Sequence, residues 1–360
     1  MPATNNSQKK KAVAIWLLVG VFMIIIQVVI GGVTRLTGSG LSITEWKPIM
    51  GTIPPMNHED WLEAFAAYKE IAQFKHLNYH YELSDFKFIY YWEWFHRIWA
   101  RLLGVVFAIP FVYFLVKKYF MKEMILPLII LFFLGGFQGF IGWYMVQSGL
   151  YGSELLNVSH IRLSIHFIAA LILLVYTLWF ALKLLIPKEK VIYDSKAKNY
   201  FLWLTGILTI QLFYGAFMAG LQAARFAPTW PKINGHWIPA NLMENSWINH
   251  AINIQFAHRG IAYLLVIMII IGLLKTNQLA KQNKSSLLKK AGKWPIILVI
   301  IQVILGVYSL LSVKTITKGK FGMYEALAEF HQIVGMLLLI SIFIILYLIR
   351  HEKKGKLKSS

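Results

Sequence analysis

The sequence predicts an all-α integral membrane protein with eight transmembrane helices. Of its 360 residues, 58% are hydrophobic and 14% are charged, whereas about 25% of the residues of a soluble protein are charged. Its apolar runs also match the roughly 20 residues that a helix needs to cross a bilayer. The predicted spans cover residues 12–33, 88–116, 124–146, 159–186, 199–222, 251–274, 294–313 and 326–349.

Lysine and arginine are distributed unevenly between the loops that join these spans. Of 36 such residues, 22 fall on the side that carries both termini, 10 on the other side, and four arginines lie within spans. Cytoplasmic loops carry an excess of Lys and Arg, so we expect both termini in the cytoplasm. This distribution explains the net charge of +20 without a nucleic acid partner, and no basic–aromatic repeat of a single-strand binder is present.

The chain has no cysteine. Disulfides, thiolate metal ligands, iron–sulfur clusters and a cysteine nucleophile are therefore excluded. The polar stretch 1–11 leads directly into the first apolar run, which is too long for the core of a signal peptide. We expect this run to be retained as the first span.

The longest loop, residues 34–87, is predicted to face outside and to contain one short helix. Asn57 has the residue type of an N-cap. Apolar residues follow it at helical spacing, so we expect an amphipathic helix on the outer surface of the membrane. These residues are Trp61, Phe65, Tyr68 and Ala72.

The second half of the chain repeats residues of the first half. His258-Arg259 follows His96-Arg97 at an offset of 162, and His331 follows His166 at an offset of 165. Four crossings return the chain to its starting side, so we predict two tandem four-helix bundles with the same orientation, residues 1–190 and 191–360. A glutamine four residues before a glycine also recurs, in Gln27 with Gly31, Gln138 with Gly142, Gln211 with Gly215, and Gln302 with Gly306.

Four histidines lie within predicted spans that run from outside to inside: His96, His166, His258 and His331. All four fall roughly 8–12 Å below the outer boundary, at 1.5 Å per residue. Each half thus offers two imidazoles from two helices at one level, which suits a haem iron bound from both faces, or a single copper or iron ion. Haem is favoured because no nearby acid or cysteine completes a tetrahedral set. Structural hydrogen bonding of buried histidines is the alternative.

Charged neighbours of these histidines are candidate site residues. Arg97 and Arg259 each follow a histidine and suit a haem propionate, or else extend toward lipid headgroups. Glu93 corresponds by the same offset to Gln255, and only the glutamate can exchange a proton. We therefore predict that the first half reacts and that the second half holds a permanent cofactor. A simple ion pair of Glu93 with Arg97 or Arg101 is the competing explanation.

Several segments together resemble the haem A synthase family over nearly the whole chain. The long first loop and the TWP segment resemble its mitochondrial and proteobacterial branch, which lacks the external-loop cysteines of other branches. Ala257 and the pair His160-Ile161 depart from that branch. The matching segments are 31–42 (GGVTRLTGSGLS), 46–48 (WKP), 51–55 (GTIPP), 93–97 (EWFHR), 142–146 (GWYMV), 148–150 (SGL), 215–217 (GAF), 229–231 (TWP), 255–259 (QFAHR) and 331–332 (HQ).

The resemblance implies an oxidoreductase that converts a methyl group of haem O to the formyl group of haem A by successive hydroxylations with water-derived oxygen. His96 and His166 would bind the iron of the substrate haem, with Glu93 as the catalytic residue. A b-type haem cofactor would be held in the second half by His258 and His331. Arg97 and Arg259 would assist cofactor binding.

The resemblance also implies a bacterial plasma membrane location and a role in supplying a terminal oxidase. Candidate partners are haem O synthase, the oxidase assembly machinery, membrane lipid and a second copy of the chain. Two alternatives remain open from the residues themselves. One is a bis-haem electron-transfer cytochrome that leaves its haems unchanged. The other is a transporter that uses Glu93 and the histidines as a proton relay.

Overall fold

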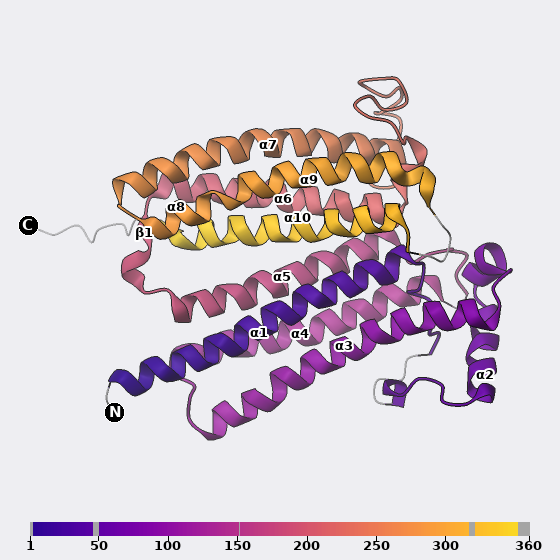
Figure 1. Ribbon diagram of the computed structural model, residues 1–360, viewed down its shortest axis with the longest axis horizontal. Coiled ribbons are helices and arrows are strands. Elements are labelled where there is room, and N and C mark those ends of the chain that lie inside the picture. Colours follow the sequence, from indigo (N-terminus) through magenta and orange to yellow (C-terminus); the bar gives the residue numbers. More distant parts are fainter. Residues whose placement is uncertain (1–2, 46–49, 151, 317–320, 352–360) are drawn as a thin grey trace, which may run out of the picture.

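The computed structural model describes residues 3–45, 50–150, 152–316 and 321–351, so the predicted WKP segment, 46–48, lies outside the described residues. Within them, eight helices are long and apolar enough to span a membrane, and they lie side by side (Figure 1). The all-α membrane fold is therefore confirmed. The spanning helices are α1 Ala3–Leu36, α3 Leu83–Val116, α4 Lys122–Val146, α5 His160–Leu185, α6 Ser195–Gly220, α7 Ala251–Gln282, α9 Trp294–Leu311 and α10 Met323–Leu348.

Several helices continue beyond the apolar runs that predict them. Helix α3 begins at Leu83 instead of 88, because Glu82 and Asp85 form a capping box in which the Asp85 carboxylate accepts a hydrogen bond from the Glu82 backbone N–H at 3.0 Å. Helix α1 includes most of the polar stretch expected as a tail, and α7 continues to Gln282. An apolar run identifies only the part of a helix that lies in lipid, so polar turns at the ends of the helix are missed.

The spanning helices pack in two groups that share one core (Figure 1). Helix α1 packs on α3 and α5, and α4 packs on α5; in the second group α6 packs on α7, and α9 on α10. Helices α1, α5, α6 and α10 form the contact between the groups. Their fully buried side chains include Leu174, Phe201, Met336 and Ile342.

Polar contacts at the outer ends of the helices also join the two groups. The Gln332 side chain donates a hydrogen bond from α10 to the Val28 carbonyl of α1 at 3.1 Å. The Arg35 guanidinium, at the end of α1, donates to the Ala219 carbonyl of α6. Glu329 of α10 packs directly against Gly32 of α1. The wall between the two groups is therefore polar near its outer edge.

The short helix predicted in the first external loop is present as α2, His58–Lys69. Its N-cap is Asn57, whose side chain accepts from the Asp60 N–H at 2.8 Å, as the sequence predicts. Its apolar stripe packs on the outer turns of α3, where Trp61, Phe65 and Tyr68 surround Phe86. The extension of α3 supplies a protein surface for the stripe that we expected to lie on the membrane.

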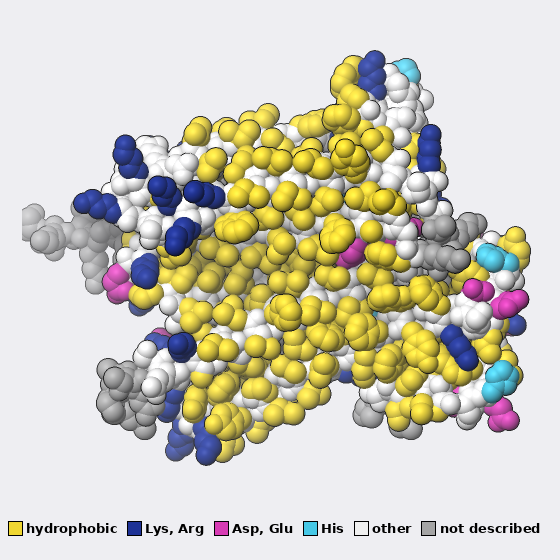
Figure 2. All heavy atoms as spheres, in the orientation of Figure 1, with side chains coloured by type: hydrophobic (Ala, Val, Ile, Leu, Met, Phe, Trp, Pro, Cys, Tyr) yellow, Lys and Arg dark blue, Asp and Glu magenta, His cyan; other side chains and the backbone are white. Residues whose placement is uncertain are grey.

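The first helix begins and the last helix ends at the same end of the molecule (Figure 1). Lysine and arginine side chains gather at this end (Figure 2). The two-residue strands β1, Ile192–Tyr193, and β2, Ile349–Arg350, pair in parallel there, and α8, Ser286–Gly292, lies nearby. This pairing ties the α5–α6 connection to the end of α10.

Truncating Phe86 should detach α2 from α3. The Phe86 side chain is fully buried, and replacing a buried phenylalanine by alanine typically costs about 3–5 kcal/mol. We expect Phe86→Ala to make residues 53–82 much more sensitive to limited proteolysis while the spanning helices stay protected. Phe88→Ala, on the exposed side of the same helix, is the matched control. Equal protection of both variants would contradict the packing described.

Candidate haem-binding site

The structure brings the four predicted histidines together as two pairs. His96 of α3 and His166 of α5 belong to the first group of helices, and His258 of α7 and His331 of α10 belong to the second. All four are partly buried at the level of the outer helical turns. Among the described residues, no group of three or more His, Asp or Glu side chains could hold a bare metal ion.

The second pair has a spacing that fits an iron atom between two imidazoles. The ring centroids of His258 and His331 are 6.3 Å apart, with an angle of 67° between the ring planes. Two opposed metal–imidazole bonds of about 2.0 Å each place the bonded nitrogens about 4 Å apart. The ring centres lie behind those nitrogens, so the observed spacing leaves room for one metal ion. The residues present fit a haem ligated from both faces.

His96 of α3 and His166 of α5 are the corresponding pair in the first half. Among the described residues, these two rings make no contact of the kind that joins His258 and His331.

Each histidine is contacted by a glutamine from a neighbouring helix. Amide nitrogens lie 3.2 Å from the His166 Nδ1, 3.4 Å from the His258 Nε2 and 3.3 Å from the His331 Nε2. For His96 the amide donates to the backbone carbonyl at 3.2 Å. The four glutamines are Gln27, Gln138, Gln211 and Gln302.

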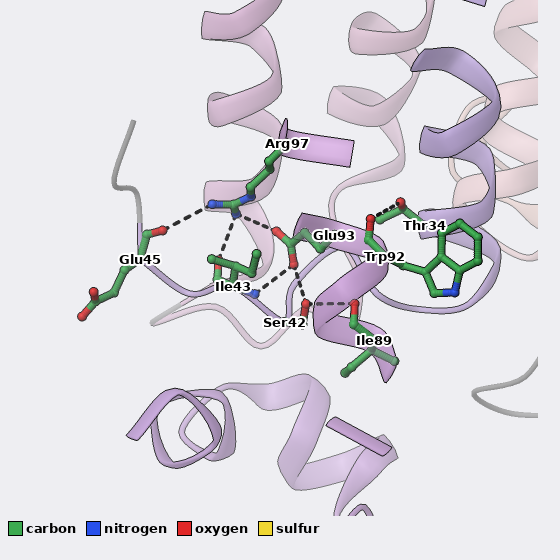
Figure 3. Close-up of polar contacts among 8 residues, drawn as sticks. All are labelled: Thr34, Ser42, Ile43, Glu45, Ile89, Trp92, Glu93 and Arg97. Atoms are coloured by element: carbon green, nitrogen blue, oxygen red, sulfur yellow. Dashed lines mark hydrogen bonds and ion pairs between the residues drawn. The ribbon is translucent and has the colours of Figure 1, made fainter. Parts of the chain in front are cut away.

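Glu93 lies in a hydrogen-bonded network between α3 and the segment that follows α1 (Figure 3). One carboxylate oxygen is 2.6 Å from Arg97. The other accepts hydrogen bonds from the Ser42 hydroxyl at 2.8 Å and from the Ile43 N–H at 2.9 Å. Arg97 in turn donates to the Ile43 carbonyl at 2.9 Å. Both carboxylate oxygens therefore have partners, and the ion pair weighed as the competing explanation is present.

The second half contains a version of this network in which an amide replaces the carboxylate. Gln255 accepts a hydrogen bond from Arg259, four residues later, and its amide donates to the Ala223 carbonyl at 2.8 Å. Arg259 also donates to the Ala227 carbonyl at 3.3 Å. A carboxylate therefore faces a backbone N–H in the first half, whereas an amide N–H faces a backbone carbonyl in the second. Each side chain matches the hydrogen-bonding group opposite it.

Some site residues were not identified from the sequence. In the sequence, four glutamines stand out only as markers of the repeat: Gln27, Gln138, Gln211 and Gln302. Ser42 and Ile43 give no local signal, because their partner Glu93 is about 50 residues away. Glu329 is buried, and its carboxylate has no hydrogen-bond partner among the described residues. An acid within an apolar run, 326–349, is the signal that identifies it.

Removing the negative charge of Glu93 should loosen the segment that it binds. A hydrogen bond to a charged group contributes about 1.5–3 kcal/mol, so Glu93→Gln should speed amide hydrogen exchange at Ile43 by roughly 10- to 100-fold. Exchange mass spectrometry of the detergent-solubilised chain measures this. Gln255→Glu, the reverse change in the second half, should leave exchange at Ile43 unchanged. Equal exchange in Glu93→Gln and the wild type would contradict the network.

Comparison with known proteins identifies the family. The model of the cytochrome oxidase assembly protein family, COX15-CtaA, matches residues 14–348. The haem A synthase of Flavobacterium johnsoniae is 38% identical over 341 residues, which cover 92% of this chain and 96% of that protein. The haem A synthase of Flavobacterium psychrophilum is 41% identical over 314 residues, which cover 84% of this chain and 91% of that protein. The haem A synthase of Bartonella henselae is 37% identical over 329 residues, which cover 90% of this chain and 90% of that protein. With the family match extending across all eight spanning helices, this chain belongs to the COX15-CtaA family of cytochrome oxidase assembly proteins.

Proposed function

We propose that this chain is a haem A synthase, an oxidoreductase that converts a methyl group of haem O to the formyl group of haem A. The names of its relatives support this reading. The observation that carries it is the pair of histidine sites at the outer ends of the helices, one in each group of helices. An enzyme whose substrate and cofactor are both haems needs two such sites.

The two sites differ in ways that assign their occupants. We assign residues 1–190 to the substrate haem O, with His96 and His166 as its iron ligands, because Glu93 in this half can exchange a proton and Gln255 in the other half cannot. We assign residues 191–360 to a resident b-type haem held by His258 and His331. The ring contact of the second pair suits a cofactor that stays bound.

The proposed reaction consists of two hydroxylations of one methyl group with water-derived oxygen. The product is a geminal diol, which loses water to give the aldehyde. Each hydroxylation releases two electrons and two protons; a b-type haem, when bound, would pass these electrons one at a time to an external electron acceptor. The protein has to keep the methyl group oriented and provide a group that accepts a proton or stabilises positive charge.

Glu93 is our candidate for that group. It lies on α3 three residues before His96, and residues at this spacing share a helix face. Its carboxylate oxygens accept hydrogen bonds from Arg97 and from the Ile43 N–H, and a carboxylate positioned in this way can accept a proton. The corresponding position in the second half, Gln255, cannot accept one. This difference supports chemistry in the first half only.

Arg97 and Arg259 are our candidates for haem propionate partners. Each guanidinium is oriented by an acceptor four residues earlier, Glu93 or Gln255, and by carbonyl groups of the external segments. Both therefore lie on the outer side of the histidines. A propionate bound there would be near water, and the rest of the macrocycle would lie among apolar side chains.

The proposed function also has consequences for the location, orientation and partners of the chain. We place the chain in a bacterial plasma membrane with both termini in the cytoplasm, since Lys and Arg concentrate at that end. The family description refers to cytochrome oxidase assembly, so haem O synthase and the oxidase assembly machinery are proposed partners. Self-association is proposed alongside them.

Expression of the full chain in membranes supplied with haem O tests this function. We expect hydroxylated haem O and haem A in the extracted pigments, as identified by chromatography and mass spectrometry. His96→Ala and His166→Ala should abolish both products while keeping the b-type haem, because only the substrate ligands are lost. His258→Ala and His331→Ala should remove the b-type haem. Glu93→Gln should lower haem A formation at unchanged haem b content.

The matched control is His80→Ala, an exposed histidine of the external loop. It should leave both the haem content and the products unchanged. Stable haem b with no modified haem would instead identify a bis-haem electron carrier. A colourless protein would exclude haem chemistry altogether.

A further inference from the structure

Four glutamines remain without a role in the proposed reaction, although each contacts one candidate ligand. They lie on α1, α4, α6 and α9, and each histidine lies on the spanning helix that follows in the chain. A buried amide is costly in an apolar environment unless it is hydrogen-bonded. The same costly residue is therefore present four times, in contact with a ring nitrogen in three cases and with the backbone carbonyl of His96 in the fourth. This recurrence requires an explanation beyond helix packing.

A glycine one turn after each glutamine lies directly against the same histidine. A Cβ atom added at these glycines would lie close to an imidazole atom in every case. The distance from the added Cβ atom is 3.2 Å to the His96 Nε2 for Gly31 and 2.9 Å to the His166 Cε1 for Gly142. It is 3.4 Å to the His258 Cε1 for Gly215 and 2.8 Å to the His331 Cε1 for Gly306. The glycine leaves the space that the ring fills.

The four glutamines also share an unused hydrogen-bonding group. Each side-chain carbonyl oxygen, Oε1, is buried and has no hydrogen-bond partner among the described residues, in Gln27, Gln138, Gln211 and Gln302 alike. An unsatisfied buried acceptor costs about 1–3 kcal/mol. An amide can offer either its N–H or its carbonyl after half a turn. Gln138, Gln211 and Gln302 lie beside ring nitrogens and can therefore bond to a nitrogen that carries a proton or to one that does not. Gln27 contacts the backbone carbonyl of its histidine.

We propose that these four glutamines are positioning residues for the four candidate haem ligands, and that each glutamine–glycine pair forms a cradle for one imidazole. This inference rests on the proposed function, because it takes the histidines as haem ligands. A histidine that binds iron through one nitrogen keeps a proton on the other, and that N–H needs an acceptor. Gln138 faces the His166 Nδ1, where its carbonyl can supply that acceptor.

The two ligands of the second half depend on their glutamines to different degrees. The His331 Nδ1 donates to the backbone carbonyl of Gln302 at 3.0 Å, so this ring keeps a hydrogen bond when the Gln302 side chain is removed. The His258 Nδ1 has no partner among the described residues, and the Gln211 amide is the group that contacts this ring. His258 is therefore the more dependent ligand.

Haem binding by the purified full chain tests the proposal directly. Protein produced under haem limitation is titrated with haem b, and the Soret absorption gives the dissociation constant. Loss of a group that orients a metal-bound histidine typically costs 10- to 100-fold in affinity. We expect about this loss for Gln211→Leu, a smaller loss for Gln302→Leu, and no change for Gln278→Leu, an exposed position on α7. Electron paramagnetic resonance of the ferric haem should show shifted low-spin signals for Gln211→Leu.

The glycines provide a second series that keeps the glutamines intact. Gly306→Ala places a methyl group 2.8 Å from His331, whereas the same change at Gly215 gives an ordinary contact of 3.4 Å with His258. We expect Gly306→Ala to weaken haem b binding and shift the low-spin signals, and Gly215→Ala to remain close to the wild type. Gly206→Ala, where a methyl group meets open space, is the control for the fold.

Three outcomes separate this inference from the function on which it rests. Weaker binding in Gln211→Leu and Gly306→Ala, with normal binding in the controls, supports the cradles. Wild-type affinity and wild-type spectra in both variants overturn the cradles and leave the synthase function standing. A wild-type chain that binds no haem overturns the proposed function itself.

Discussion

The constraint on which the rest of this structure depends is the cost of polar groups among apolar helices. Imidazoles, amides and carboxylates lie in spans that are otherwise hydrophobic, and several of them have their hydrogen-bond partners on another helix or on an external segment. A hydrogen bond between two side chains sets the relative depth of the helices that carry them. The contact between Gln302 and His331 thus fixes how α9 and α10 slide against each other, and Gln138 with His166 does the same for α4 and α5.

Much of the fold could be predicted because its signals are local. Eight apolar runs, their order and the capped helix at Asn57 all follow from residues that are neighbours in the chain. The burial of α2 could not be predicted in this way, because Trp61 and Phe65 meet Phe86 only after the loop has turned back. The pairing of β1 with β2 joins residues more than 150 positions apart, and no periodic pattern marks two-residue strands.

The histidines of the candidate site could be predicted because they recur in both halves of the chain. The hydrogen-bond partners of Glu93 could not be predicted. Histidines at one depth on alternate spans are visible from spacing alone. The partners of Glu93 come from a segment without regular structure, so Ser42 and Ile43 could not be assigned before the fold was known. The role of Gln255 depends on the Ala223 carbonyl, a backbone group that sequence patterns do not report. The catalytic role of Glu93 stays a prediction, because its ion pair with Arg97 agrees both with a catalytic role and with a purely structural one.

The contact between α1 and α10 has a consequence for biogenesis. The Val28 carbonyl and the Gln332 amide that bonds to it are separated by 304 positions, so the last spanning helix leaves the ribosome long after the first has entered the bilayer. Until then, the face of α1 that carries Gly32 lacks its final neighbour. The contact between the two groups of helices is therefore completed only at the end of translation.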